Sequence, residues 1–225
     1  MTDSQANDGG FEGWVKWVFD HPVTEPEWYE SENAEHWTAS PVVIVDYITR
    51  LFEEAPTLLS AYSDAQAAQG LWFLGIGIFC DGVPSIYREA VLRSQRERCI
   101  RSIYNLFEKY FAIKCSSHLS NIDEQGANPL NVVCYMWWDF LSHEAQDPEG
   151  RIGTDMDADV LSTMQRILHL NQDACVESAL HGLGHWQHLC PDDVAGIIDR
   201  FVATNPDVRH ELRTYALEAR SGRVQ

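Results

Sequence analysis

Apolar residues recur along this chain at three- and four-residue spacing, and this spacing most constrains how the chain can fold. One run places its members on a single helix face: Val43, Ile44, Tyr47, Ile48, Leu51, Phe52 and Ala55. A second run behaves in the same way: Ile100, Ile103, Tyr104, Phe107 and Phe111. No segment of useful length alternates apolar and polar residues as a half-buried strand does. The pattern therefore predicts an all-α protein.

Helix-start signals divide the chain into short helical segments. Ser40 precedes Pro41, which pairs an N-capping hydroxyl with a proline at the first helical position. Capping boxes, in which two side chains three residues apart satisfy each other's free N–H, are expected at Ser63–Gln66 and Ser94–Glu97. Several starts come in pairs joined by short turns, and such pairs predict antiparallel helical hairpins packed side by side.

The chain is expected to form a single folded domain. Its length is sufficient to bury a large apolar core without disulfides or metal. Residues 1–10 are polar and without pattern, so we expect a disordered N-terminus followed by one all-α domain over residues 11–225.

The segment 177–186, ESALHGLGHW, is the helical stretch that most resembles a known family. Together with the short amphipathic pairs around it, this segment is similar to the HEAT-type α-helical repeats. The resemblance is carried mainly by the C-terminal third. It implies a right-handed array of hairpins that binds macromolecules on a curved surface and carries no catalytic residues. A compact multi-helix bundle is the alternative arrangement.

The chain is strongly acidic, with 34 Asp and Glu against 16 Lys and Arg and a formal net charge of −18. A field of this sign repels nucleic acid and anionic membranes and attracts basic proteins. The acidic residues concentrate in residues 1–64 and 120–165. They form either a well-solvated surface or a docking face for a basic protein.

Aromatic residues among these acids favour the docking interpretation, because Trp and Tyr dominate binding hot spots and carboxylates steer basic partners. The alternative is that the N-terminal Trp side chains attach this segment to its own helical body. The leading hypothesis is a non-enzymatic, acidic protein-binding module, such as a bacterial immunity-type inhibitor of a basic toxin. Its candidate contact residues are Glu27, Trp28, Glu30, Glu32, Trp37, Asp155, Asp157 and Asp159.

A histidine stripe supports a second hypothesis. At helical spacing Glu177, His181, His185 and His188 share one narrow face, and the apolar residues of the segment centre on the opposite face. We therefore expect the stripe to face away from the main core. Two histidines one turn apart can share a transition metal such as Zn²⁺, and Glu177 could add an oxygen.

The histidine spacing is not H-E-x-x-H, so no general base is predicted. The stripe is compatible with a metal-binding protein or a metal-dependent hydrolase. A solvated or interface-lining face is the alternative interpretation of the stripe, and a structural scaffold is the remaining alternative.

Six cysteines occur without a C-x-x-C pair, and no basic start followed by an apolar run indicates a secretory signal. We therefore expect reduced, mostly buried thiols in a cytoplasmic protein. The longest apolar run, residues 71–80, is too short to span a bilayer.

Overall fold

The computed structural model describes residues 9–31, 37–79, 86, 88–141 and 156–224, and every regular element within them is helical. The elements are α1 Gly10–Phe19, η1 Trp28–Glu30, α2 Pro41–Leu58, α3 Asp64–Phe79, α4 Arg93–Leu106, η3 Phe107–Phe111, α5 Ala112–Lys114, α6 Leu130–Tyr135, η4 Met136–Leu141, α7 Asp157–Ile167, α8 Asp173–Trp186, α9 Pro191–Thr204 and α10 His210–Ala219. The all-α prediction is confirmed for these residues. Of the tail predicted at 1–10, residues 1–8 lie outside the described part, and α1 begins at Gly10.

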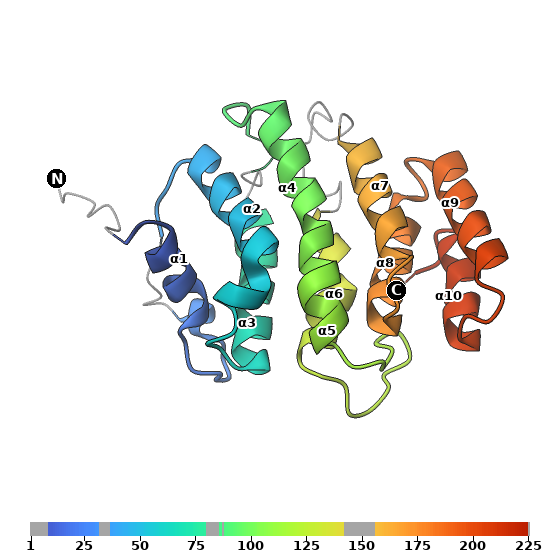
Figure 1. The fold of residues 1–225 in the computed structure, drawn as a ribbon, viewed down its shortest axis with the longest axis horizontal. Helices are drawn as coiled ribbons and strands as arrows, with labels where there is room; N and C mark the ends of the chain where they lie inside the picture. The colour runs from blue at the N-terminus through green and yellow to red at the C-terminus, as the bar shows by residue number, and fades with distance from the viewer. Residues whose placement is uncertain (1–8, 32–36, 80–85, 87, 142–155, 225) are drawn as a thin grey trace.

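The helices lie in two layers (Figure 1). In the front layer α2 packs against α4 and α4 against α7, while behind them α3 packs against α6 and α6 against α8. At one end α1 packs against α3, and at the other end α9 and α10 pack against α8. The arrangement is a multi-helix bundle of neighbouring elements, and membership of the HEAT-type repeats stays a prediction.

Two of the three predicted helix starts are confirmed in their details. The Ser40 hydroxyl accepts the Val43 N–H at 3.4 Å, with Pro41 at the first helical position. Ser63 and Gln66 form the predicted capping box, in which each side chain accepts the other residue's N–H at 3.2 Å. These caps set where α2 and α3 begin.

The third predicted start, at Ser94, is wrong by two residues. Helix α4 is capped at Leu92, whose N–H donates to the Gln95 side chain at 3.0 Å. Glu97 lies inside the helix and pairs with Arg93 at 2.8 Å. The Gln side chain therefore serves as the cap that the sequence pattern assigned to Glu97.

Helix α8 lies at the centre of the bundle and is buried on all sides from Ala174 to Gly184. The expectation that its histidine stripe faces away from the core is therefore wrong for Glu177 and His181, which are 0% and 1% exposed. Polar side chains on such a helix must find partners inside the protein, because an unpaired buried polar group is costly.

Among the described residues, no helix combines the length and the apolar character needed to cross a membrane. The described cysteines are free thiols, four of them buried and one half-buried. Cys80 lies outside the described residues.

Candidate metal centre

Three potential metal ligands converge where η4 meets α8. Asp139 comes from η4, and His181 and His185 come from adjacent turns of α8. Gly182 allows this close approach, because a Cβ there would lie 2.5 Å from the Trp138 ring and 2.6 Å from the Met164 sulfur. Trp138 is fully buried, so its packing against α8 brings the neighbouring Asp139 beside the two histidines.

The ligand atoms of the three side chains form a small triangle. The Asp139 Oδ1 atom lies 3.1 Å from His181 Nε2 and 2.9 Å from His185 Nε2. The two Nε2 atoms lie 3.1 Å from each other. Two imidazole nitrogens at this separation need either a shared proton or a cation between them, because two N–H groups or two lone pairs repel.

The carboxylate of this triangle is held in its charged form. Burial of Asp139 acts to raise its pKa, but hydrogen bonds and charge interactions with His181 and His185 outweigh burial and keep the pKa well below its usual value. Side-chain exposure is 26% for Asp139 and 36% for His185, against 1% for His181. The triangle therefore has one buried corner and two corners that reach solvent.

Two tyrosines support the buried corner. The Tyr215 hydroxyl lies 2.7 Å from His181 Nδ1 and 2.9 Å from the Tyr135 hydroxyl. Burial raises the pKa of both phenols, that of Tyr135 to about 12, so both remain neutral hydroxyls at physiological pH. When Nδ1–H donates to Tyr215, the lone pair of His181 is at Nε2 and faces the triangle.

The triangle fits a transition-metal ion. Ligands in a tetrahedral zinc site lie about 2.1 Å from the ion, so an ion bound to all three atoms would lie about 1 Å from their plane. Two imidazoles and one carboxylate are the donor set of open zinc and non-haem iron sites. Among the described residues, no fourth His, Cys, Asp or Glu joins this group.

The structure separates the four residues of the predicted stripe. His181 and His185 come together, whereas the Glu177 carboxylate accepts the N–H groups of Ser120 and Asn121 at 3.0 and 2.8 Å. His188 is exposed beyond the end of α8. Glu177 therefore fastens the loop before α6 to α8, and Asp139 supplies the oxygen that the sequence pattern assigned to Glu177.

Sequence reasoning missed Asp139 because it lies 42 positions before His181. One local signal could have found it. Asp139 is a single acid inside the apolar run Met136–Leu141, where its neighbours are buried. A carboxylate in such a run needs a partner of opposite charge or a metal.

The candidate binding residues near the N-terminus lie around a cluster of aromatic rings. Trp28 stacks on His21 with ring centroids 3.8 Å apart, and the rings of Trp28 and Trp37 contact that of Trp17 in α1 at 5.6 and 5.8 Å. Both Trp side chains are half-buried, as is Glu27, while Glu30 is exposed. The two Trp side chains thus attach this segment to α1, which is the alternative that the sequence left open.

The remaining candidate binding residues lie at the start of α7 or outside the described part. Asp157 accepts a hydrogen bond from the Trp186 ring N–H at 3.3 Å, and Asp159 lies 4.0 Å from Arg101. Glu32 and Asp155 lie outside the described residues. Both described acids are therefore engaged within the protein.

Comparison of the chain with protein-family models, with curated proteins and with solved structures gives no significant match. The functional assignment consequently depends on the geometry of the chain's own residues.

Proposed function

We propose that this protein binds one divalent transition-metal ion, with Zn²⁺ the best match, through Asp139, His181 and His185. The single observation that carries the proposal is the triangle of one carboxylate oxygen and two Nε2 atoms, each within 3.1 Å of the others. A hydrogen bond between Asp139 and one histidine would explain why two of these three atoms lie close together. It does not explain why the second imidazole also directs its Nε2 atom at the first.

The donor set favours an open site over a closed structural one. Structural zinc sites use four protein ligands, whereas catalytic sites use three and leave a position for water or substrate. Exposure of Asp139 and His185 gives that position access to solvent. Bound there, the ion would supply Lewis-acid chemistry of the kind that metal-dependent hydrolases use.

Each residue around the ion would have a separate task. His181 provides a fixed, buried ligand oriented by Tyr215, and Asp139 provides the negative charge that favours a cation. His185 is the most exposed of the three and forms the side of the site nearest to solvent. A substrate would approach from this side.

The test is metal analysis of the purified, untagged protein together with its melting temperature with and without chelator. We expect one ion per chain and a lower melting temperature after chelation. His185→Gln and Asp139→Asn should lose the ion, while the exposed His188→Gln should keep it. A metal-free protein that ignores added Zn²⁺, or equal metal content in His185→Gln and the unmodified protein, would refute the proposal.

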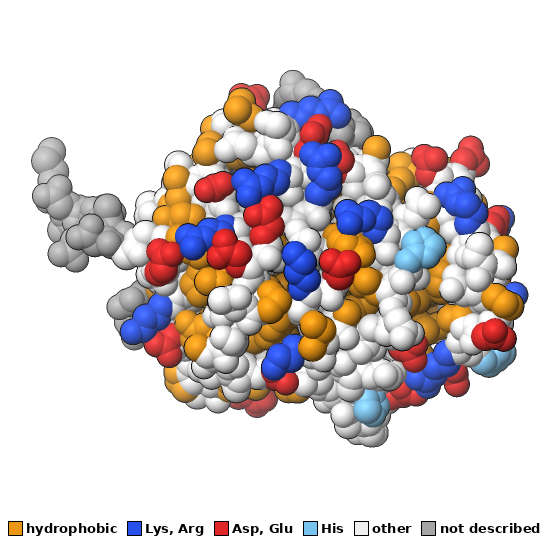
Figure 2. Space-filling view, in the orientation of Figure 1, with side chains coloured by type: hydrophobic (Ala, Val, Ile, Leu, Met, Phe, Trp, Pro, Cys, Tyr) orange, Lys and Arg blue, Asp and Glu red, His pale blue; other side chains and the backbone are white. Residues whose placement is uncertain are grey.

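A second candidate function is binding of a basic protein, as an immunity-type inhibitor of a cytoplasmic bacterial toxin does. One observation favours it: most described basic side chains are already paired with acids of the same chain. Figure 2 shows the two signs interspersed over α2 and α4. The pairs are Lys16 with Asp20, Arg50 with Glu12 and Glu54, Arg93 with Glu97, Arg101 with Glu97 and Asp159, Arg98 with Glu53, Lys114 with Asp64, Arg209 with Glu124, Asp173 and Glu211, and Arg220 with Asp199.

Because these basic side chains are paired internally, the excess acidic residues remain available to the basic side chains of a partner protein. A HEAT-like array of hairpins would present these acidic residues on an extended surface. The proposal is tested by adding the protein to a basic microbial ribonuclease and measuring RNA cleavage. We expect inhibition that weakens in Glu30→Lys and stays unchanged in Asp207→Lys, an equal charge change at the other end of the molecule. Absence of inhibition, or equal loss in both variants, would contradict a local docking face.

A further inference from the structure

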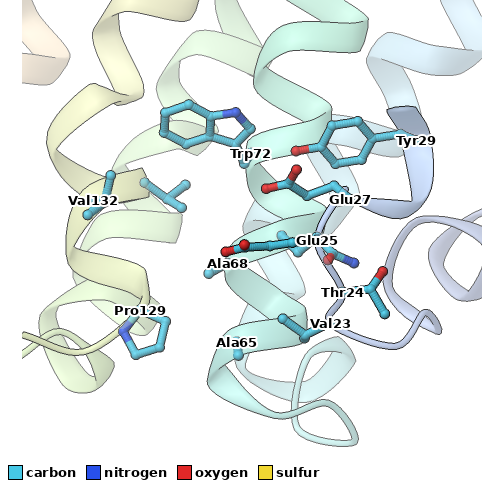
Figure 3. Close-up of a pocket in the computed structure, with 12 residues that line it drawn as sticks. Val23, Thr24, Glu25, Glu27, Tyr29, Ala65, Ala68, Trp72, Pro129 and Val132 are labelled. Carbon is cyan, nitrogen blue, oxygen red and sulfur yellow. The ribbon is translucent and has the colours of Figure 1, made fainter. Parts of the chain in front are cut away.

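A cavity of about 610 Å³ lies between residues 23–29 and the helices α3 and α6 (Figure 3). It shares no residue with the metal centre and is formed by different elements. Its volume is in the range of small-molecule sites, which span about 300–1,000 Å³. The cavity is therefore large enough for a ligand of its own.

The polar groups that line this cavity are predominantly hydrogen-bond acceptors. In Figure 3 the carboxylates of Glu25 and Glu27 extend into the space, and the Tyr29 hydroxyl points toward Glu27. No Lys, Arg or His is among the lining residues, and neither Glu25 nor Glu27 forms an ion pair within the described part of the chain. Two uncompensated carboxylates at one cavity create a potential that favours a cation.

A buried amide on the cavity wall adds an independent indication. Gln69 lines the cavity and is only 9% exposed, and its side-chain oxygen has no hydrogen-bond partner among the described residues. Its amide nitrogen contacts the Pro22 carbonyl at 3.5 Å. Native proteins rarely leave a buried acceptor unpaired, and this oxygen, which is shielded from solvent, would pair with a donor in the cavity after a small rotation of the amide.

The rest of the lining is apolar and partly exposed. Val23 and Val132 are 55% and 50% exposed, and the Trp72 ring lies between Val132 and Glu27 in Figure 3. Ala65, Ala68, Pro129 and Val133 complete the apolar wall. An occupant that covers these side chains would remove apolar surface from water. An aromatic ring of the cavity beside a carboxylate is also a favourable place for an ammonium group.

We propose that this cavity binds a small organic cation in which an ammonium or guanidinium group is joined to an apolar body. The cationic group lies between the carboxylates of Glu25 and Glu27 and donates hydrogen bonds to them. The apolar body covers Trp72, Val23 and Val132. The size of the cavity favours a whole small molecule over a single Lys or Arg side chain of a partner protein, which would leave most of the space open.

The test compares three probes that share an indole ring and differ in the charge of the side chain: tryptamine, tryptophol and indole propionate. Binding to the 225-residue chain is measured by ligand-detected NMR titration. We expect tryptamine to bind, and tryptophol to bind about tenfold more weakly because charge-assisted hydrogen bonds are about twice as strong as neutral ones. The anionic propionate should not bind.

Three variants assign the binding to this cavity. Glu25→Gln with Glu27→Gln should weaken tryptamine binding about tenfold while leaving tryptophol unchanged. Val132→Lys, at an exposed position on α6, places a competing cation at the cavity and should abolish tryptamine binding. Glu30→Gln removes one negative charge from the same segment but lies outside the lining, and it should bind tryptamine as the unmodified protein does.

Equal affinity for tryptamine and tryptophol would overturn the proposal, since it would show that the carboxylates do not select the ligand. Equal losses in Glu30→Gln and in the double variant would also overturn it, because attraction would then come from the overall negative charge. No binding of tryptamine at millimolar concentration would have the same consequence.

Discussion

Glu177 on α8 and Asp139 on the neighbouring η4 are two carboxylates whose surroundings shift their pKa values in opposite directions. Burial raises the pKa of Glu177 to about 7, and its two backbone N–H donors only partly offset that effect. Asp139 is held charged by two histidines despite its burial. The difference comes from the partner: an imidazole can carry a full positive charge, whereas a backbone N–H cannot.

The raised pKa of Glu177 makes stability depend on pH. The folded protein keeps a proton on Glu177 up to about pH 7, whereas the unfolded chain loses it near 4.5. Its contribution to stability is therefore complete below pH 4.5 and is lost as the pH rises toward 7. We expect the free energy of unfolding to fall by about 3 kcal/mol over this window relative to Glu177→Gln. Urea denaturation of both proteins at several pH values measures the difference, and parallel pH profiles would contradict it.

Tyr215 is a second residue with an individual role, because it orients His181 through a single hydrogen bond. Tyr215→Phe removes that bond and frees the imidazole to rotate or change tautomer. We expect Zn²⁺ affinity to fall about 10- to 100-fold, as for other outer partners of metal ligands. Competition with a chromogenic chelator measures the affinity. Tyr104→Phe, which removes a hydroxyl bonded to the exposed Glu108, is the control and should leave the affinity unchanged.

Among the elements, the helices of this protein could be predicted from the sequence. The candidate site could be predicted only in part. Helix α2 is specified by its own apolar spacing and by its Ser40 cap, which are local features. The metal centre depends on a contact between η4 and α8, and no local pattern specifies that contact. For the same reason the stripe on α8 appeared to face outward: periodicity shows which residues share a face, but not how many neighbours surround a helix.

Gly182 offers a test of this contact between elements. Gly182→Ala would place a Cβ 2.5 Å from Trp138 and 2.6 Å from Met164, so η4 must shift away from α8. We expect a loss of about 1–3 kcal/mol in stability, as for other overpacked cores, and weaker metal binding because Asp139 follows Trp138. Thermal denaturation and Zn²⁺ titration measure the two effects.

Gly196→Ala is the matched control for this substitution. Gly196 lies inside α9, and a Cβ there would approach nothing closer than the Arg200 side chain at 3.5 Å. Alanine has the higher helix propensity, so this variant should gain up to about 1 kcal/mol. If both glycine variants had equal effects, close packing of η4 on α8 would not be the cause.

For the molecule as a whole, the excess of acidic residues lowers the stability of the folded state. A net charge of −18 repels itself in a compact fold, and the internal pairs leave this excess in place. We expect the melting temperature to rise between about 0.05 and 0.5 M NaCl, because the Debye length shortens over this range. Differential scanning calorimetry measures the trend. A melting temperature that falls with salt would show that the internal ion pairs outweigh the self-repulsion.

The proposed metal centre requires that Asp139, His181 and His185 together hold one ion. The most direct measurement is an anomalous difference map from crystals of the protein grown with Zn²⁺, recorded at the zinc absorption edge. We predict one strong peak about 2.1 Å from the Oδ1 and the two Nε2 atoms. A fully occupied peak elsewhere, or no peak at this triangle at saturating Zn²⁺, would contradict the account and leave the three side chains as a hydrogen-bonded network.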